Sequence, residues 1–205
     1  MQEQEYVSFH GTEKSIAYAK INYNPSNIIV TTYQMELQKG LRYRSQRRGV
    51  KAKLPGSLGY GFYTFIKTKQ VTKDFISRQV SEYKIIKVCS KFEDDQVLDF
   101  NSQETREQFH AFRTEFLKRS EKIIEIFGNH TNNYKQHVMD GLVIENFIEA
   151  LSKNKNKVTK AVVAWTFTPC DDKSENIKFV SFIPNGLELC IRDKERIISL
   201  EEGDV

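Results

Sequence analysis

The order of its apolar runs constrains the fold of this chain more than any other feature. Three short runs of strand-like composition stand near the C-terminal end: KAVVAWTF at 160–167, IKFVSFI at 177–183 and LELCIRD at 187–193. Short segments rich in β-branched and aromatic residues favour strands. Strands concentrated late in the chain, with helices between the earlier strands, are typical of an α+β protein.

Further elements are expected before these runs. The strand candidates are EYVSFHG (5–11), YGFYTF (60–65), EYKIIKVCSKF (82–92) and QVLDF (96–100). NIIVTTY (27–33) is expected to be extended or to run into a helix. The helix candidates are EKSIAYAK (13–20), KTKQVTKDFISRQV (67–80) and the second half of GLVIENFIEAL (141–151), which begins like a strand. The clearest helix spans 102–128, where apolar residues recur at helical spacing between an N-cap candidate, Ser102, and a stop signal, Gly128.

Length and composition predict one domain over residues 1–205, because a chain of this length with 39% hydrophobic residues can bury a sizeable core. No apolar run approaches the roughly 20 residues that cross a bilayer, and no signal-peptide pattern is visible. Cys89, Cys170 and Cys190 are odd in number and far apart, which favours buried thiols in a reducing compartment. The expected location is the cytoplasm, with no membrane partner.

One stretch of the chain is strongly basic. Between Leu37 and Lys73 there are ten Lys or Arg residues and no acid, although the net charge of the whole chain is only +4. Its glycines and proline predict a basic loop insertion at about 39–58. Such a segment attracts phosphate or another polyanion, or serves only as a solvated surface. Arg47 and Arg48 are its candidates for docking an acceptor or a phosphate.

The sequence excludes several common active sites. There is no phosphate loop ending in Gly-Lys-Ser/Thr, no complete dinucleotide fingerprint and no serine nucleophile elbow. No metal is expected, because neither a His-Glu-x-x-His pattern nor a Cys/His cluster occurs. What remains is His10 near the front, the glycine- and aromatic-rich stretch LPGSLGYGFYTF (54–65), and Glu188 on a late strand.

The order of FHGT (9–12), LGYGFYTF (58–65) and a late strand with a glutamate resembles the ADP-ribosyltransferase superfamily. The branch is the His-Tyr-Glu one, shared by diphtheria-toxin-like and poly(ADP-ribose)-polymerase-like enzymes and by small bacterial or phage proteins. Residues 97–117, 140–148 and 185–200 are similar to later segments of small bacterial members. The resemblance implies a split β-sandwich, in which two small, mainly antiparallel sheets pack face to face with helices around them.

The resemblance also implies an activity, the transfer of one ADP-ribose from NAD to an unknown acceptor, protein or nucleic acid, as toxins and phage-defence effectors do. The implied catalytic residues are Glu188, His10 and Tyr63. Glu188 would stabilise the cationic ribose, His10 would bind a ribose hydroxyl, and Tyr63 would stack on the nicotinamide. The other implied NAD-binding residues are Gly11, Thr12, Gly59 and Gly61, of which the glycines allow close approach of backbone and ligand.

Alternatives stay open at this level. The chain could be an inactive relative that binds a nucleotide or a protein, or a glycohydrolase that uses water as the acceptor. Each of the three residues also has an ordinary structural interpretation: a strand-end histidine, a core tyrosine and a solvent-facing glutamate. Glu195, Glu201 and Glu202 are the other late carboxylates that could take the place of Glu188.

Overall fold

The computed structural model describes residues 2–46, 51–119, 123, 126–127, 136–168 and 183–203, with backbone only for 46 and 136–138. The strands are β1 (Glu3–Glu13), β2 (Phe62–Ile66), β3 (Tyr83–Glu93), β4 (Val97–Asp99), β5 (Ala161–Thr166), β6 (Gly186–Ile191) and β7 (Ile197–Gly203). The helices are α1 (Lys14–Ile16), α2 (Tyr33–Gln46), α3 (Lys69–Ser77), α4 (Gln103–Leu117) and α6 (Gln136–Lys155). Single turns lie at η1 (Ala17–Ile21), η2 (Pro25–Asn27), η3 (Asp94–Gln96) and η4 (Lys194–Arg196).

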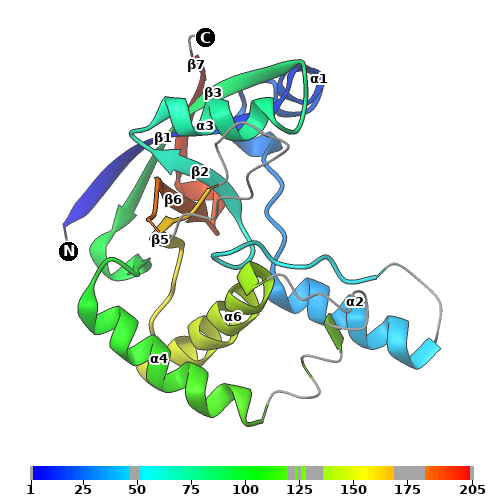
Figure 1. Cartoon of the computed structure of the whole chain (residues 1–205), viewed down its shortest axis with the longest axis vertical. Helices are drawn as coiled ribbons and strands as arrows, with labels where there is room; N and C mark the ends of the chain where they lie inside the picture. Colours follow the sequence, from blue (N-terminus) through cyan, green and yellow to red (C-terminus); the bar gives the residue numbers. More distant parts are fainter. Residues whose placement is uncertain are drawn as a thin grey trace, which may run out of the picture.

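Hydrogen bonding joins the seven described strands into one sheet, in the order β4-β5-β6-β2-β1-β3-β7 (Figure 1). All neighbours are antiparallel except β4 and β5, which are parallel. The junction between β2 and β1 consists of the pairs Ser8–Ile66 and Phe9–Phe65 alone. By contrast, β1 and β3 pair along their whole length, from Glu3–Glu93 to Glu13–Tyr83. The sheet therefore has two halves with a narrow connection.

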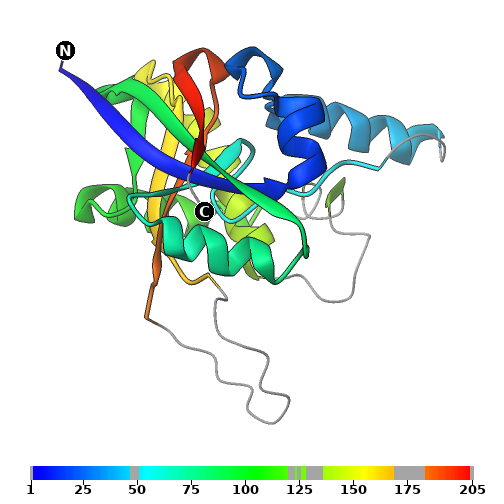
Figure 2. The ribbon, with the colours of Figure 1, turned by 90° about the horizontal axis from the view of Figure 1, so that it is seen from above.

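The two halves share one hydrophobic core. The half made of β1, β3 and β7 contributes buried Ile86, Val88, Phe92, Ile197 and Leu200. The half made of β5, β6 and β2 contributes Phe62, Ile66, Ala161, Val163, Leu189 and Ile191 to the same cluster. Side chains from both halves can touch only if the sheet folds over on itself, and Figure 2 shows β1 and β3 crossing over the other strands.

Helices α4 and α6 cover the outer face of the β5-β6-β2 half (Figure 1). Strand alternation sends Val162, Ala164 and Cys190 to this face, where they pack on Phe109 and Phe147 of the two helices. Ser102 caps α4, since its hydroxyl accepts a hydrogen bond from the Thr105 amide at 3.5 Å. Helix α3 packs mainly on β1, in the other half of the sheet.

The structure confirms the α+β class and most elements, and it corrects others. The two expected sheets are hydrogen-bonded into one, because β1 and β2 pair at two positions. The stretch expected as a loop at 39–58 begins within α2, a helix that ends at residue 46. The segment 141–151 is helical throughout, since it lies inside α6. The helix expected at 102–128 is shorter, because α4 ends at Leu117 and a turn follows at 118–119. The expected strand at 177–183 falls almost wholly outside the described residues.

Within the described ranges, no helix is long and apolar enough to span a bilayer. Of the cysteines, Cys190 is buried and Cys89 is half-buried, whereas Cys170 lies outside the described residues. The burial of Cys190 raises the pKa of its thiol to about 12. This thiol is therefore inert at neutral pH, as the sequence predicts.

Candidate functional site

A cavity of about 500 Å³ lies where β1, β2 and β6 meet α3 and the segments 56–57 and 166–168. His10, Tyr63 and Glu188 all line it. These residues come from three different strands and lie far apart in the sequence, yet the fold brings them to one place. The rest of the lining is mainly apolar and aromatic, and it includes Phe9, Phe65, Phe75 and Phe167.

The register of β2 and β6 places Tyr63 and Glu188 on one face of the sheet. Tyr63 pairs with Cys190, and Phe65 pairs with Glu188. Directly paired residues point to the same face, and so do residues two apart on one strand. Phe75 from α3 closes the far side, with its ring edge-on to Phe65 at 6.1 Å between centroids. The Glu188 carboxylate is thus set among aromatic rings.

His10 lies at the end of the short junction between β1 and β2. Its Nδ1 is 2.8 Å from the Tyr63 carbonyl, and its ring packs on Phe62 at 4.3 Å between centroids. A carbonyl oxygen can only accept, so Nδ1 carries the hydrogen. Burial lowers the pKa of His10, which the bond to the carbonyl opposes. The neutral ring therefore keeps Nε2 as a hydrogen-bond acceptor.

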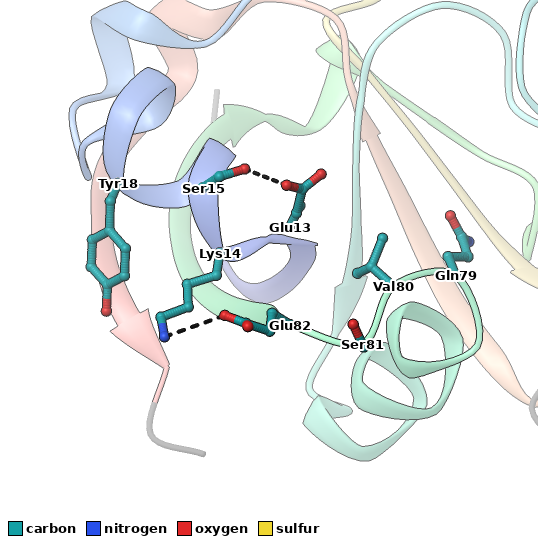
Figure 3. Close-up of a pocket in the computed structure, with 8 residues that line it drawn as sticks. All are labelled: Glu13, Lys14, Ser15, Tyr18, Gln79, Val80, Ser81 and Glu82. Carbon is teal, nitrogen blue, oxygen red and sulfur yellow. Dashed lines mark hydrogen bonds and ion pairs between the residues drawn. The ribbon is translucent and has the colours of Figure 1, made fainter.

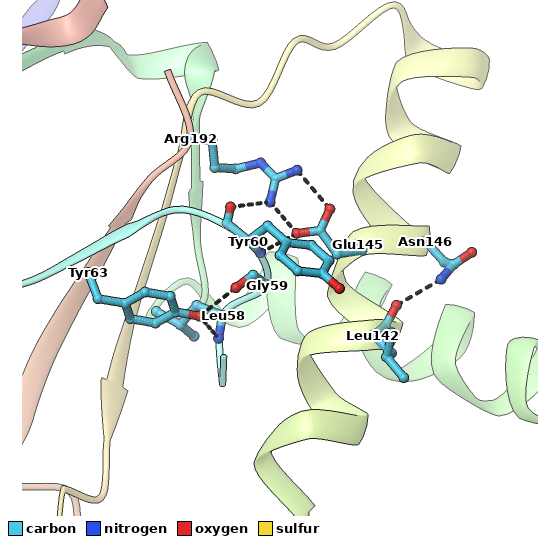
Figure 4. A network of polar contacts seen from close by, with 8 residues as sticks. All are labelled: Leu58, Gly59, Tyr60, Tyr63, Leu142, Glu145, Asn146 and Arg192. Atoms are coloured by element: carbon cyan, nitrogen blue, oxygen red, sulfur yellow. Dashed lines mark hydrogen bonds and ion pairs between the residues drawn. The ribbon is translucent and has the colours of Figure 1, made fainter. Parts of the chain in front are cut away.

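The Tyr63 ring is held at its hydroxyl by the turn that precedes β2 (Figure 4). The hydroxyl accepts from the Leu58 amide at 2.8 Å and donates to the Gly59 carbonyl at 2.7 Å. Burial raises the pKa of this hydroxyl well above its ordinary value. Tyr63 is consequently a neutral, fixed aromatic wall of the cavity.

Glu188 is half-buried, and the Ser57 hydroxyl donates to its Oε2 at 2.9 Å. Burial raises the pKa of Glu188, whereas hydrogen bonds from Ser57 and Thr166 oppose this shift. No described cation forms an ion pair with the Glu188 carboxylate. A carboxylate that is shielded from water and lacks a counter-ion is suited to stabilise positive charge that develops beside it.

A buried ion pair holds the turn that carries Ser57 (Figure 4). Arg192, just after β6, donates to both carboxylate oxygens of Glu145 on α6, at 2.5 and 2.8 Å. Glu145 also accepts from the Tyr60 amide at 2.5 Å, and Arg192 donates to the Tyr60 carbonyl at 3.1 Å. The Glu145 side chain is 1% exposed. Three segments of the chain are thereby joined behind the cavity.

The glycines of the turn fit this packing. Gly59 has φ +91°, and a Cβ there would lie 2.3 Å from the Glu145 carboxylate. Gly61 lies against Cys190 and the Ile191 carbonyl. Neither residue lines the cavity, and side-chain packing alone accounts for a glycine at both positions. Gly56 is the glycine of this turn that lines the cavity.

The remaining predicted site residues also differ in whether they line the cavity. Gly11 lines the cavity, and a Cβ there would lie 2.8 Å from the Ile76 Cβ of α3, so close helix packing also requires a glycine. Thr12 is buried and does not line the cavity. Arg47 and Arg48 lie outside the described residues.

The alternative late carboxylates lie away from the cavity. Glu201 and Glu202 form ion pairs with Lys87 and Lys84, and Glu195 is exposed in η4. Their positions leave Glu188 as the late glutamate that lines the cavity.

A second hollow, of about 760 Å³, lies beside α1 (Figure 3). Two polar contacts join residues of its lining: Lys14 pairs with Glu82 at 3.5 Å, and Ser15 donates to Glu13. None of the predicted site residues lines it. No cluster of three or more His, Cys, Asp or Glu side chains suited to a metal occurs among the described residues.

Sequence reasoning missed Ser57, Phe75 and the Glu145–Arg192 pair. Ser57 lies inside the quoted stretch 54–65, but nothing in the sequence says that its partner is 131 positions away. Phe75 has the spacing of a core residue on α3, and its place beside the cavity depends on how α3 packs. Glu145 is an acid inside an apolar helix, and that anomaly was the available signal for a buried partner.

Comparison of the chain with protein-family models, with curated proteins and with solved structures finds no match.

Proposed function

We propose that the chain is an ADP-ribosyltransferase that uses NAD as its substrate. The observation that carries this proposal is the meeting of His10, Tyr63 and Glu188 in one cavity. The sequence resemblance names these three residues together, and no local interaction requires them to meet. On this proposal the folded-over sheet is the split sandwich of the resembled family.

The chemistry follows from the cavity walls. Tyr63 and Phe75 offer flat surfaces for the nicotinamide ring, with aromatic contact as the main source of affinity. The bond between nicotinamide nitrogen and ribose C1′ breaks, and its electron pair leaves with the neutral nicotinamide. Positive charge then develops on C1′ and the ring oxygen of the ribose. The Glu188 carboxylate stabilises this charge, and an acceptor nucleophile forms the new bond to C1′.

In this scheme His10 contributes to the binding of NAD and not to the breaking of the glycosidic bond. Its neutral ring has Nδ1 committed to the Tyr63 carbonyl, so Nε2 is the nitrogen that can accept a hydrogen bond from a ribose hydroxyl. That bond forms before the glycosidic bond breaks and contributes to NAD binding.

The test is nicotinamide release by the purified protein, followed together with NAD affinity by calorimetry. Release with transfer of ADP-ribose to an added acceptor supports the proposal. Release with free ADP-ribose as the sole product indicates a glycohydrolase. NAD binding without release indicates an inactive nucleotide-binding relative, and the absence of both overturns the proposal.

Removing either ground-state contact is expected to weaken NAD binding. His10→Ala loses one hydrogen bond, with a net value of about 0.5–1.5 kcal/mol, so affinity falls roughly two- to tenfold. Tyr63→Ala loses the stacking surface and the hydroxyl anchor in the turn, and a larger fall is expected. Tyr63→Phe keeps the ring and separates the two effects. His110→Ala is the matched control, because this exposed histidine lies outside the cavity.

Ser57→Ala is expected to change the pH dependence of turnover. The Ser57 hydroxyl stabilises the ionised form of Glu188, so its loss raises the pKa of that carboxyl further. As the pH is lowered, activity that depends on the ionised carboxylate therefore begins to decline at a higher pH in Ser57→Ala than in the wild type. In the acidic pH range where Glu188 titrates, turnover of Ser57→Ala is expected to be roughly two- to tenfold below that of the wild type. This factor corresponds to the net free energy of one hydrogen bond. Ser57→Thr keeps a hydroxyl and should restore the profile, whereas unchanged profiles in all variants would remove Ser57 from the mechanism.

A further inference from the structure

Helix α6 approaches the turn that carries Ser57 at a point where neither partner has a side chain. A Cβ added at Gly141 would overlap the carbonyl oxygen of Gly56 and would lie 3.2 Å from the Pro55 Cβ. No larger residue fits at position 141 unless the turn or the helix moves. Glycine weakens the interior of a helix relative to alanine, and Gly141 lies within the 20 residues of α6. The contact with the turn is therefore what requires a glycine here.

The oxygen that Gly141 contacts also closes the turn. The Gly56 carbonyl accepts from the Gly59 amide at 3.2 Å, and the Gly56 amide donates to the Gly59 carbonyl at 3.2 Å. Ser57 lies between these two bridged residues. Because a peptide group is planar, the Gly56 carbonyl and the Ser57 amide belong to one rigid unit. Any tilt of that carbonyl therefore turns the backbone from which the Ser57 side chain reaches Glu188.

The turn is also enclosed on the side of the cavity. A Cβ at Gly56 would lie 2.5 Å from the Tyr63 hydroxyl, so the turn cannot move closer to this ring. The same hydroxyl holds the Leu58 amide and the Gly59 carbonyl through two hydrogen bonds. A displacement of the Gly56 carbonyl by a larger residue in α6 would therefore have to be taken up by the orientation of the turn itself.

Helix α6 is held on both sides of Gly141. One residue earlier, Asp140 forms an ion pair with Arg113 of α4 at 3.7 Å. Four residues later, Glu145 accepts from the Tyr60 amide at 2.5 Å, and Figure 4 shows its side chain reaching from α6 to this part of the chain. Residues four apart lie on the same face of a helix, so Gly141 and Glu145 both face the turn. These contacts keep the helix in place when the turn is pushed.

We propose that Gly141 is a positioning residue of the candidate site. Without a side chain, it lets α6 fix the orientation of the peptide group between Gly56 and Ser57, and this orientation directs the Ser57 hydroxyl to the Glu188 carboxylate. Gly141 does not line the cavity, so it acts on Glu188 through the turn. Its effect on catalysis rests on the proposed function, whereas its control of the hydrogen bond between Ser57 and Glu188 does not.

This hydrogen bond is tested by titration of the Glu188 carboxyl, followed by carboxyl-carbon NMR and assigned by comparison with Glu188→Gln. Loss of the Ser57 hydroxyl raises the pKa of this carboxyl, because the bond stabilises its ionised form. Gly141→Ala is expected to raise the pKa in the same direction as Ser57→Ala. The double variant should titrate like Ser57→Ala alone, because both substitutions remove the same bond.

The NMR signal reports the protonation of Glu188 itself. The other titratable side chains that line the cavity are His10 of β1 and Tyr63 of β2, and all the variants except Glu188→Gln keep the three groups. A titration of Gly141→Ala that coincides with that of the wild type overturns the positioning role, and so does a further shift of full size when Gly141→Ala is added to Ser57→Ala.

Gly40→Ala is the matched control. It adds the same methyl group to a helix, α2, at a crowded position that does not line the cavity, where the Cβ would lie 2.6 Å from the Ile126 Cγ2. Both variants can lower the stability of the fold, but only Gly141→Ala is expected to change the titration of Glu188. An equal change in Gly40→Ala would show that general strain is the cause, which contradicts the proposal.

Gly56→Ala tests the same contact from the turn and serves if Gly141→Ala does not fold. Its Cβ pushes the turn away from the Tyr63 hydroxyl, so the orientation of Ser57 is again lost. The pKa of Glu188 is expected to rise here too, and an unchanged titration overturns the positioning role.

Activity separates this proposal from the proposed function. In the acidic range where Glu188 titrates, turnover of Gly141→Ala is expected to fall roughly two- to tenfold, the factor for the net loss of one hydrogen bond, while NAD affinity changes little. If the wild type releases no nicotinamide, the proposed function is overturned and the NMR titration still decides the role of Gly141. If the wild type is active and Gly141→Ala has the same titration and the same pH profile, only the positioning role is overturned.

Discussion

Glu188→Gln is expected to lower nicotinamide release by roughly 10²–10³-fold while NAD affinity changes little. Glutamine preserves the shape of the side chain and can still accept a hydrogen bond from Ser57, but it lacks the charge. A charge that matters mainly while the glycosidic bond breaks affects turnover and not ground-state binding. Turnover is measured under saturating NAD, and affinity is measured by calorimetry.

Glu195→Gln is the matched control, since it removes an exposed carboxylate of the same late region. It should leave turnover unchanged. Full activity of Glu188→Gln would show that this carboxylate has been wrongly assigned.

Stability provides a second readout, because the raised pKa of Glu188 means that the folded state holds the proton of this carboxyl more tightly than the unfolded state does. Its contribution to stability is therefore lost as pH rises through that raised pKa, and Glu188→Gln should be as stable as wild type or more so at neutral pH.

Arg192→Ala is expected to lower the free energy of unfolding by about 3–5 kcal/mol. The substitution leaves the Glu145 carboxylate, 1% exposed, without its cation in the interior. It also removes the link between α6, the end of β6 and the turn at residues 58–60. Because each kcal/mol shifts the midpoint by roughly 2–4 °C in a chain of this size, thermal denaturation should show a fall of at least about 6 °C.

Adding Glu145→Gln should recover part of this loss. The amide oxygen can still accept from the Tyr60 amide, and the buried charge is gone. Lys153→Ala is the control, because its ion pair with Glu149 lies on the surface of α6, with the lysine side chain 70% exposed. It should cost less than about 1 kcal/mol. An Arg192→Ala effect no larger than that of Lys153→Ala would contradict the structural role of the buried pair.

The fold was predictable where local pattern and burial agree. The alternation from Ile86 to Phe92 and the cap at Ser102 specify a strand and a helix start without knowledge of the rest of the chain. Helix α2 was missed because its charged residues and Gly40 resemble a loop, whereas Tyr33 and Glu36 are buried in the fold. The single sheet also could not be foreseen, since only two residue pairs of β1 and β2 join its halves.

The main residues of the candidate site could be predicted from the sequence, whereas the contacts that hold them in place could not. The order of His10, Tyr63 and Glu188 could be read from the sequence, and the structure places all three around one cavity. The packing of Gly59 and Gly61 could not be foreseen, because a glycine requirement from side-chain packing looks the same in sequence as one from ligand approach. The contacts of Ser57 and Arg192 join residues more than 100 and 40 positions apart, respectively, and no local pattern encodes them.

The position of β6 in the chain has a consequence during synthesis. Strand β1 is central in the sheet and can pair with β2 and β3 as soon as these have left the ribosome. The cavity, however, lacks one wall until residues 186–191 emerge and pair with β2 and β5. A nascent chain that ends before β6 therefore holds His10 and Tyr63 without Glu188. On the proposed function, catalysis would therefore begin only after residues 186–191 have been translated.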